Sequence, residues 1–293
     1  MSVSSLNNEK SNNDKLSNDK LHNKKISFIG GGNMAQALIS GLLACGVKPE
    51  MITVSAPSME TRQRFADQHM HTVDAKTEPK AAITGADIIV LAVKPQVMKK
   101  VVSAFADALD EQLVISVAAG LSTEVLSDML GGYRHIVRAM PNTPATIQMG
   151  ATGLYATANI TDTQKQLAEA LMAASGLAMW VDFEQQMHAV TAVAGSAPAY
   201  VFYFIESMID GAIALGLDKE QASALAMQTV LGAAQMTIDS EDSPSELRRK
   251  VMSPNGTTQA AIESMQHNEI ARQIGEAMQA CYDRSQALSE EMK

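Results

Sequence analysis

The sequence predicts an α/β protein in which a doubly wound sheet of parallel strands is followed by an all-helical region. The first observation is an alternation of short apolar runs with helical patterns from residue 25 to about residue 158. Such alternation is typical of parallel strands joined by crossover helices. The second is a change to helical patterns alone after about residue 161. A chain of 293 residues, 46% of them hydrophobic, is long enough for two domains.

We expect a disordered polar tail over residues 1–24, a nucleotide-binding domain over 25–183 and a helical domain over 184–293. The tail is rich in Asn, Ser, Lys and Asp, so it offers almost no apolar surface to offset the entropy of ordering. It has no apolar core for a secretory signal, and it lacks arginine while carrying acids, which argues against a mitochondrial presequence. These features favour a cytoplasmic protein.

The first predicted strand, Lys25–Ile29, runs into three consecutive glycines and then into a helical pattern over Asn33–Cys45. Gly30, Gly32 and Ala35 form a GxGxxA pattern at this turn. Gly30 permits the tight turn, Gly32 lets the backbone approach a pyrophosphate, and Ala35 lets the helix pack close to the strand. Free N–H groups at the helix start would hold the anion. The pattern predicts a dinucleotide site, and the alternative is a tight turn of purely geometric origin.

Further strands are predicted over residues 51–55, 86–93, 113–120, 135–140, 152–157 and 178–182. Three of these runs end on unusual residues, namely Lys94-Pro95, Ala118-Ala119-Gly120 and Pro141-Asn142-Thr143-Pro144. Ligands bind at the carboxyl ends of strands in such sheets, so these residues are candidate cofactor contacts. The alternative is that Gly and Pro simply end strands.

The end of the second strand indicates the choice of cofactor. Enzymes that use NAD commonly carry an acid about 20 residues past the glycines, whereas here the strand runs into Ala56-Pro57-Ser58. Ser55 and the nearby Arg62 and Arg64 favour NADPH, with NADH as a weaker possibility. The alternative is that both arginines are ordinary solvated helix residues.

Composition argues against several other functions. The formal charge of −9 gives little support to a nucleic-acid role. The two cysteines, Cys45 and Cys281, form no CxxC or other metal-ligand spacing, and a reducing cytosol fits them best. His69 and His71 are expected near a helix end among polar residues, so we predict no metal site.

The helical region begins with Thr161 and Gln164 as a capping pair and Gly176 as a stop. Residues 187–215 are then apolar around nearly the whole helix circumference. Glu206, Asp210 and an internal Pro198 argue against a membrane span and for a buried helix. A helix apolar on every face needs partners on every side, which indicates a subunit interface.

Near the C-terminus, two short helices are predicted to meet at residues 253–256, with the second starting around Thr257 and Thr258. A helix start with free N–H groups beside two hydroxyls is a good seat for a carboxylate. The alternative is an ordinary capped helix.

Six ordered blocks over nearly the whole chain after residue 24 resemble pyrroline-5-carboxylate reductase: FIGGGNMA, AVKP, SVAAG, MPNTPA, AGSAPAYVF and SPNGTT. The resemblance implies a Rossmann-type domain followed by a helical dimerisation domain. It also implies NAD(P)H-dependent reduction of the cyclic imine 1-pyrroline-5-carboxylate to L-proline, the last step of proline biosynthesis. Rings larger than a dimer occur in the family, so the sequence does not fix the number of subunits. It also does not show whether proline inhibits the enzyme, or whether the imine comes from glutamate or from ornithine.

The resemblance further implies the contact residues. Those for the cofactor are Ile29, Gly30, Gly31, Gly32, Asn33, Met34 and Ala35 at the pyrophosphate, and Ser55, Ala56, Ala92, Val93, Lys94, Pro95, Val117, Ala118, Ala119 and Asn142 around the rest of the molecule. Those for the substrate, at the dimer interface, are Glu241, Val251, Ser253, Gly256, Thr257 and Thr258. The family usually has SPGG where this chain has Asn255 in place of the first glycine, and Asn tolerates a left-handed backbone. The chain also differs from the family at Ala56 and Pro79. These two differences affect only the expected contacts to the adenosine end of the cofactor.

In the resulting chemical hypothesis, backbone N–H groups of Gly256, Thr257 and Thr258 hold the substrate carboxylate. The Thr258 hydroxyl hydrogen-bonds the ring nitrogen as the catalytic residue, and Ser253 lines the same pocket. A rival hydroxyacid dehydrogenase would need a lysine in the long helix, and residues 187–215 contain none. A second rival is a non-catalytic NADP-binding regulator, against which the intact SPNGTT segment argues.

Overall fold

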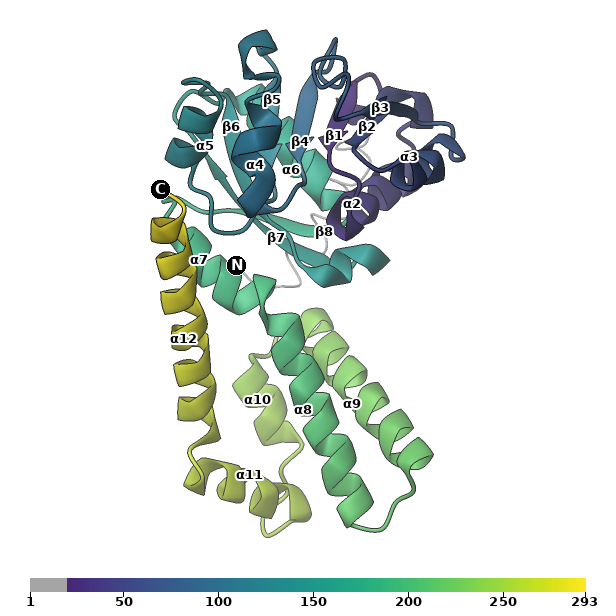
Figure 1. Ribbon diagram of the computed structural model, residues 1–293. Helices are drawn as coiled ribbons and strands as arrows, with labels where there is room; N and C mark the ends of the chain where they lie inside the picture. The colour runs from purple at the N-terminus through teal and green to yellow at the C-terminus, as the bar shows by residue number, and fades with distance from the viewer. Residues whose placement is uncertain (1–19) are drawn as a thin grey trace. The chain divides into compact units, whose positions relative to one another are not determined.

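A computed structural model describes residues 20–293, and its central feature is an eight-stranded sheet of order β3-β2-β1-β4-β5-β6-β7-β8 (Figure 1). Strands β1 to β6 are mutually parallel, and the chain order reverses between β1 and β4. This is the doubly wound, Rossmann-type arrangement that the sequence predicts. The strands are β1 (Ile26–Ile29), β2 (Ile52–Ala56), β3 (His71–Asp74), β4 (Ile88–Leu91), β5 (Leu113–Ser116), β6 (Ile136–Met140), β7 (Gly150–Ala156) and β8 (Gly176–Trp180).

Two strands differ from the prediction. His71, expected near a helix end, opens β3, an edge strand that pairs with β2 alone. Its sequence HTVD carries a single strongly apolar residue, so its strand character depends on the neighbouring β2. Strand β7 runs antiparallel to β6. The connection between them contains only the short helix η3 (Thr143–Ile147), which is too short for the crossover that a parallel strand requires.

Helices cover both faces of the sheet. One apolar core lies under α2 (Asn33–Ala44), α3 (Met59–Ala66) and α6 (Asp162–Ala173), and another under α4 (Pro95–Val102) and α5 (Thr123–Met129). Successive strand residues therefore alternate between two buried faces, which explains why the central strands are mostly apolar. In β4, for example, Ile88 and Val90 join the first core and Ile89 and Leu91 the second. Two short 3-10 helices, η1 (Pro49–Met51) and η2 (Ala106–Ala108), complete this half.

The predicted cap of α6 is confirmed, because Thr161 and Gln164 form a reciprocal capping box. The predicted stop is shifted, since the helix ends at Ala173 and Gly176 instead opens β8 with φ 144. Most of the predicted polar tail lies outside the described residues. Its last part contradicts the prediction, because Lys20 and Leu21 are helical and Leu21, 2% exposed, belongs to the first core.

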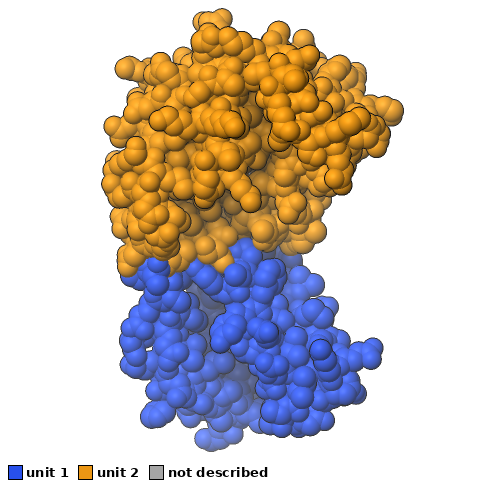
Figure 2. Space-filling view, in the orientation of Figure 1, with its two compact units in different colours: residues 1–13, 197–280 blue, residues 14–196, 281–293 orange. Residues whose placement is uncertain are grey.

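The chain divides into two compact units, coloured separately in Figure 2. Among the described residues, the sheet-bearing unit holds 20–196 and 281–293, and the helical unit holds 197–280. The expected helical domain, residues 184–293, therefore starts earlier and ends later than the helical unit. The difference has a physical cause, because the last turns of the chain return to the sheet. The Ser285 hydroxyl lies 2.9 Å from Nδ1 of His188, and Met292 packs against the second core.

The remaining helices are α7 (Gln186–Val190), the π-helix η4 (Thr191–Gly195), α8 (Ala197–Ala214), α9 (Lys219–Asp239), α10 (Pro244–Lys250), α11 (Thr257–His267) and α12 (Ile270–Glu291). Residues 186–214 are long and apolar enough to cross a membrane by length and composition alone, and a single such helix is weak support for a span. Within residues 20–293 of the single chain no residue of α8 is buried, whereas Met187, His188 and Ala192 ahead of it are. The burial of this stretch in a subunit interface stays a prediction. Phe202 and Tyr203 are 64% and 72% exposed.

Candidate functional site

The glycine turn between β1 and α2 fits a bound pyrophosphate. Gly30 has φ 109, and a Cβ there would lie 2.6 Å from the carbonyl oxygen of Ala92, so this position requires glycine. A Cβ at Gly32 would meet nothing within 4 Å, so the backbone there faces open space. Gly32 is also the N-cap of α2 and supplies no side-chain cap. The first-turn N–H groups of α2 are therefore left to an external acceptor, as at anion sites on helix N-termini.

The sheet brings all the predicted cofactor residues to one edge, the edge formed by the carboxyl ends of its parallel strands. They follow the carboxyl ends of β1, β2, β4, β5 and β6, which lie side by side. Ile29 and Gly30 to Ala35 come from β1 and α2, Ser55 and Ala56 from β2, Ala92 to Pro95 from the β4–α4 turn, Val117 to Ala119 from the segment after β5, and Asn142 from the segment after β6. The edge includes the point where the strand order reverses, where doubly wound sheets bind their ligands.

A cavity of about 540 Å³ opens beside this edge. Gly30 and Ser55 line one part, and apolar residues of α4, among them Val97 and Val101, line another. Such a slot suits a flat heteroaromatic ring. Two lysines that sequence reasoning missed, Lys76 and Lys100, also line it. No sequence motif marks them, because they come from separate loops and helices that only the fold brings together.

The two arginines of α3 are engaged within the fold, in contrast to the expectation that they stand available. Arg64 donates a hydrogen bond of 2.7 Å to the carbonyl of Gly31 in the glycine turn. Arg62 donates one of 2.8 Å to the carbonyl of Ala56, and its Nη2 lies 2.8 Å from Oδ2 of Asp74. Asp74 was also missed, because it ends β3 and not β2.

Asn142 turns its side chain inward. Its Nδ2 donates to the carbonyl of Ala194 in the π-helix at 3.1 Å, and its Oδ1 accepts from the N–H of Ala151 at 2.9 Å. The side chain is 8% exposed. Both ends of the amide thus help to hold η4 to the start of β7.

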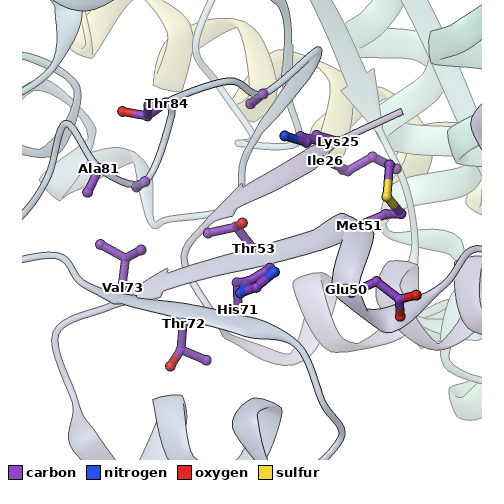
Figure 3. Close-up of a pocket in the computed structure, with 12 residues that line it drawn as sticks. Lys25, Ile26, Glu50, Met51, Thr53, His71, Thr72, Val73, Ala81 and Thr84 are labelled. Atoms are coloured by element: carbon purple, nitrogen blue, oxygen red, sulfur yellow. The ribbon is translucent and has the colours of Figure 1, made fainter. Parts of the chain in front are cut away.

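A second pocket, of about 360 Å³, lies at the opposite end of the sheet (Figure 3). Lys25, Thr53 and His71 line it near the amino ends of β1, β2 and β3, and none of the predicted site residues is among its walls. Within residues 20–293 no group of three or more His, Cys, Asp and Glu side chains could hold a metal ion.

In the helical unit, the predicted substrate segment forms a tight turn between α10 and α11. Asn255 has φ 58, the left-handed conformation expected of it. Gly256 is the N-cap of α11 without a side-chain cap, so the first amides of α11 are free of helical partners. The N–H of Gly256, one of the three donors expected for the substrate carboxylate, instead donates to the carbonyl of Ser253 at 3.0 Å. The amides of Thr257 and Thr258 remain.

The side chains at this turn differ in exposure, with Thr258 half-buried and Ser253 and Thr257 exposed. Upstream, Glu241 is exposed just after α9, and Val251 is 59% exposed at the end of α10. Helix α10 is fastened at both ends. Ser243 and Glu246 form a capping box, and Asp242 pairs with Lys250. The hydrogen bond from Lys250 lowers the pKa of Asp242.

Comparison with known proteins gives consistent matches for both halves. A family model described as pyrroline-5-carboxylate reductase dimerisation matches residues 184–288, and one described as NADP oxidoreductase coenzyme F420-dependent matches residues 25–120. The chain is 48% identical over 269 residues to a pyrroline-5-carboxylate reductase of Pseudomonas aeruginosa, covering 92% of this chain and 98% of the relative.

Solved structures agree with these matches. A pyrroline-5-carboxylate reductase from Coxiella burnetii is similar with a TM-score of 0.86 and 41% identity, covering 91% of this chain and 98% of that one. A pyrroline carboxylate reductase of Plasmodium falciparum with NADP bound has a TM-score of 0.80 and 29% identity, covering 92% and 99%.

Proposed function

The chain belongs to the pyrroline-5-carboxylate reductase family, and on that premise we propose that it reduces 1-pyrroline-5-carboxylate to L-proline with NADPH. The observation that carries the cofactor half is the glycine turn. A Cβ at Gly32 would face open space, and the start of α2 has no side-chain cap. Both lie at the carboxyl ends of the parallel strands. The bound cofactor supplies a hydride.

We assign the cofactor contacts to the predicted residues from Ile29 to Asn142, with two refinements. Backbone amides at the start of α2 hold the pyrophosphate, since Gly32 leaves them exposed. Asn142 acts as a positioning residue through Ala194 and Ala151. Residues 25–183 thus serve as the cofactor domain, and residues 184–293 carry the substrate and assembly functions.

The substrate half rests on the start of α11. Its free amides at Thr257 and Thr258 provide donors for the carboxylate of the imine, aided by the positive end of the helix. We assign the hydrogen bond to the ring nitrogen to the hydroxyl of Thr258, a half-buried residue in the first turn of α11. Ser253, Val251 and Glu241 complete the surroundings of this turn.

These residues have modest chemistry to perform. The imine is more electrophilic when protonated, so the protein must mainly orient two rings and fix the charge of the substrate. Residues 251–258 contain no His, Lys or Cys that would act as a strong general acid. The proton on the ring nitrogen therefore comes from solvent or is already carried by the imine, and Thr258 holds the nitrogen in place.

We further propose a homo-oligomer built through the C-terminal helices and located in the cytoplasm. Helices α8 and α9 expose large apolar side chains that a single chain leaves uncovered, among them Phe202, Tyr203 and Leu231. The dimerisation family model spans this region. A second copy would bury the apolar stretch 186–214 without any membrane.

A steady-state assay tests the activity. Purified protein with pyrroline-5-carboxylate should oxidise NADPH and form L-proline in equal amounts, with a higher kcat/KM for NADPH than for NADH. Binding of NADPH without turnover would support a non-catalytic cofactor-binding protein instead and would contradict the proposal.

A further inference from the structure

A carboxylate lies beside the end of β2, the strand whose end commonly holds the adenosine ribose in doubly wound sheets. In enzymes of this fold that use NAD, an acid at the end of the second strand accepts hydrogen bonds from the ribose hydroxyls and would repel a 2′-phosphate. Ala56 ends β2 here and offers no such group. Asp74, however, is the register partner of Ala56 on the neighbouring strand β3. The fold thus restores an acid at this edge from a different strand.

Arg62 forms an ion pair with Asp74. Its Nη2 lies 2.8 Å from Oδ2 of Asp74, while its Nη1 donates to the carbonyl of Ala56 at 2.8 Å. The other oxygen of Asp74 accepts from the backbone N–H of Lys76 at 2.9 Å. The pair is partly shielded, with the Arg62 side chain 19% exposed and that of Asp74 29% exposed. Each carboxylate oxygen therefore already has a partner, and the negative charge of Asp74 is balanced by Arg62.

The charges around the pair favour an anion. Lys76 and Lys100 line the adjoining cavity, and neither forms an ion pair within the described part of the chain. A ribose hydroxyl would have to compete with Arg62 and the Lys76 N–H for this carboxylate, whereas a 2′-phosphate meets a balanced pair and two lysines. Removal of Arg62 would reverse this situation, since Asp74 would then be free to bind hydroxyls and to repel phosphate.

We propose that Arg62 sets the preference for NADPH by holding the Asp74 carboxylate, and that Asp74 without this partner selects NADH. Arg62 is thus a positioning residue that acts through Asp74. The proposal rests on the cofactor assignment made above. It is tested by direct cofactor binding, so its failure differs from a failure of the imine reductase activity.

The experiment measures the dissociation constants of NADPH and NADH by fluorescence titration for Arg62→Leu, Asp74→Asn and the double variant. Arg62→Leu should weaken NADPH binding about tenfold or more, because an unpaired carboxylate then faces the 2′-phosphate, while NADH binding stays equal or tightens. Asp74→Asn should keep NADPH binding within about threefold of the wild type. The double variant should return to the value of Asp74→Asn, because no carboxylate remains.

Matched variants separate this role from others. Arg64→Leu, on the same helix, loses its bond to the Gly31 carbonyl and should weaken both cofactors alike. Lys80→Gln removes an exposed partner of Asp107 and should change neither. If Arg62→Leu does not fold, Arg62→Lys, which still pairs with Asp74, should keep the preference for NADPH.

Two results would overturn the proposal. A double variant that binds NADPH as weakly as Arg62→Leu would mean that Arg62 contacts the phosphate itself. An equal loss of affinity for NADPH and for NADH in Arg62→Leu would mean that the Arg62–Asp74 pair supports the fold of the cleft and does not determine its selectivity.

Discussion

The guanidinium of Arg138 lies 3.2 Å from the carboxylate of Glu184, and only 3% of the Arg138 side chain is exposed. Arg138 belongs to β6, and Glu184 follows β8 just before α7. Glu184 also accepts 2.7 Å hydrogen bonds from the N–H and the hydroxyl of Thr123 at the start of α5. One carboxylate therefore joins three parts of the sheet-bearing unit.

The first prediction concerns this buried pair. Burial lowers the pKa of Arg138, and Glu184 opposes that shift. Glu184→Ala should lower the free energy of unfolding by about 3–5 kcal/mol, because it leaves a buried charge without a partner. The exposed pair of Lys80 and Asp107 provides the control, because Asp107→Ala should change the free energy of unfolding far less than Glu184→Ala. Urea unfolding of both variants measures the difference, and similar losses would contradict the role of burial.

The second prediction concerns pH. Burial and the charge of Arg138 lower the pKa of His188, while Glu184 raises it. The unfolded chain therefore binds a proton at this residue more readily than the folded one, so stability falls as pH drops through the ordinary histidine value of about 6.5. Each unit by which the pKa is lowered corresponds to about 1.4 kcal/mol.

His188→Gln tests this effect, because its amide can still hydrogen-bond Ser285 but does not titrate. The loss of melting temperature between pH 7.5 and pH 5.5 should be smaller in the variant than in the wild type. The other histidines are the same in both proteins, so their contributions cancel in the comparison. An equal loss in both would show that His188 does not contribute.

The third prediction separates two glycines of one turn. Gly32→Val should leave the fold intact, because open space surrounds its Cβ position. It should weaken NADPH binding more than a hundredfold, or about 3 kcal/mol, because the side chain would stand where the pyrophosphate approaches. Gly30→Val should instead destabilise the fold through the carbonyl of Ala92. Circular dichroism melts and fluorescence titration measure the two effects, and unchanged cofactor affinity in Gly32→Val would contradict the site.

The fourth prediction tests the catalytic assignment. Thr258→Ala removes a hydroxyl but keeps the amides of α11, so kcat should fall roughly tenfold to a hundredfold while NADPH affinity stays nearly constant. Thr257→Ala is the matched control on the neighbouring residue, whose backbone alone is expected to contribute. A greater loss in Thr257→Ala, or less than a twofold change in both, would refute the placement of the ring nitrogen at Thr258.

The fifth prediction tests assembly. Phe202→Asp places a charge on an apolar surface of α8 that is 64% exposed in the single chain. If a second copy covers this surface, sedimentation should show the wild type as a dimer or larger and the variant as a smaller species. Met59→Asp, at an apolar residue of α3 that is 74% exposed, should leave the assembly unchanged. A wild-type monomer with full activity would contradict the prediction.

The sequence by itself determined the doubly wound sheet and its glycine turn, because both depend on local patterns. Apolar runs bounded by glycine specify the central strands, and the left-handed Asn255 follows from the residue type at a tight turn. The capping box at Thr161 and Gln164 is likewise a local matter of hydrogen-bond geometry.

Tertiary structure alone decided the features that join distant residues. Strand β3 forms because β2 offers it a free edge, and only that pairing brings Asp74 level with Ala56 and within reach of Arg62. The return of the last turns to His188 was equally out of reach. Each depends on contacts between segments far apart in the chain, whose energies local propensity and periodicity do not contain.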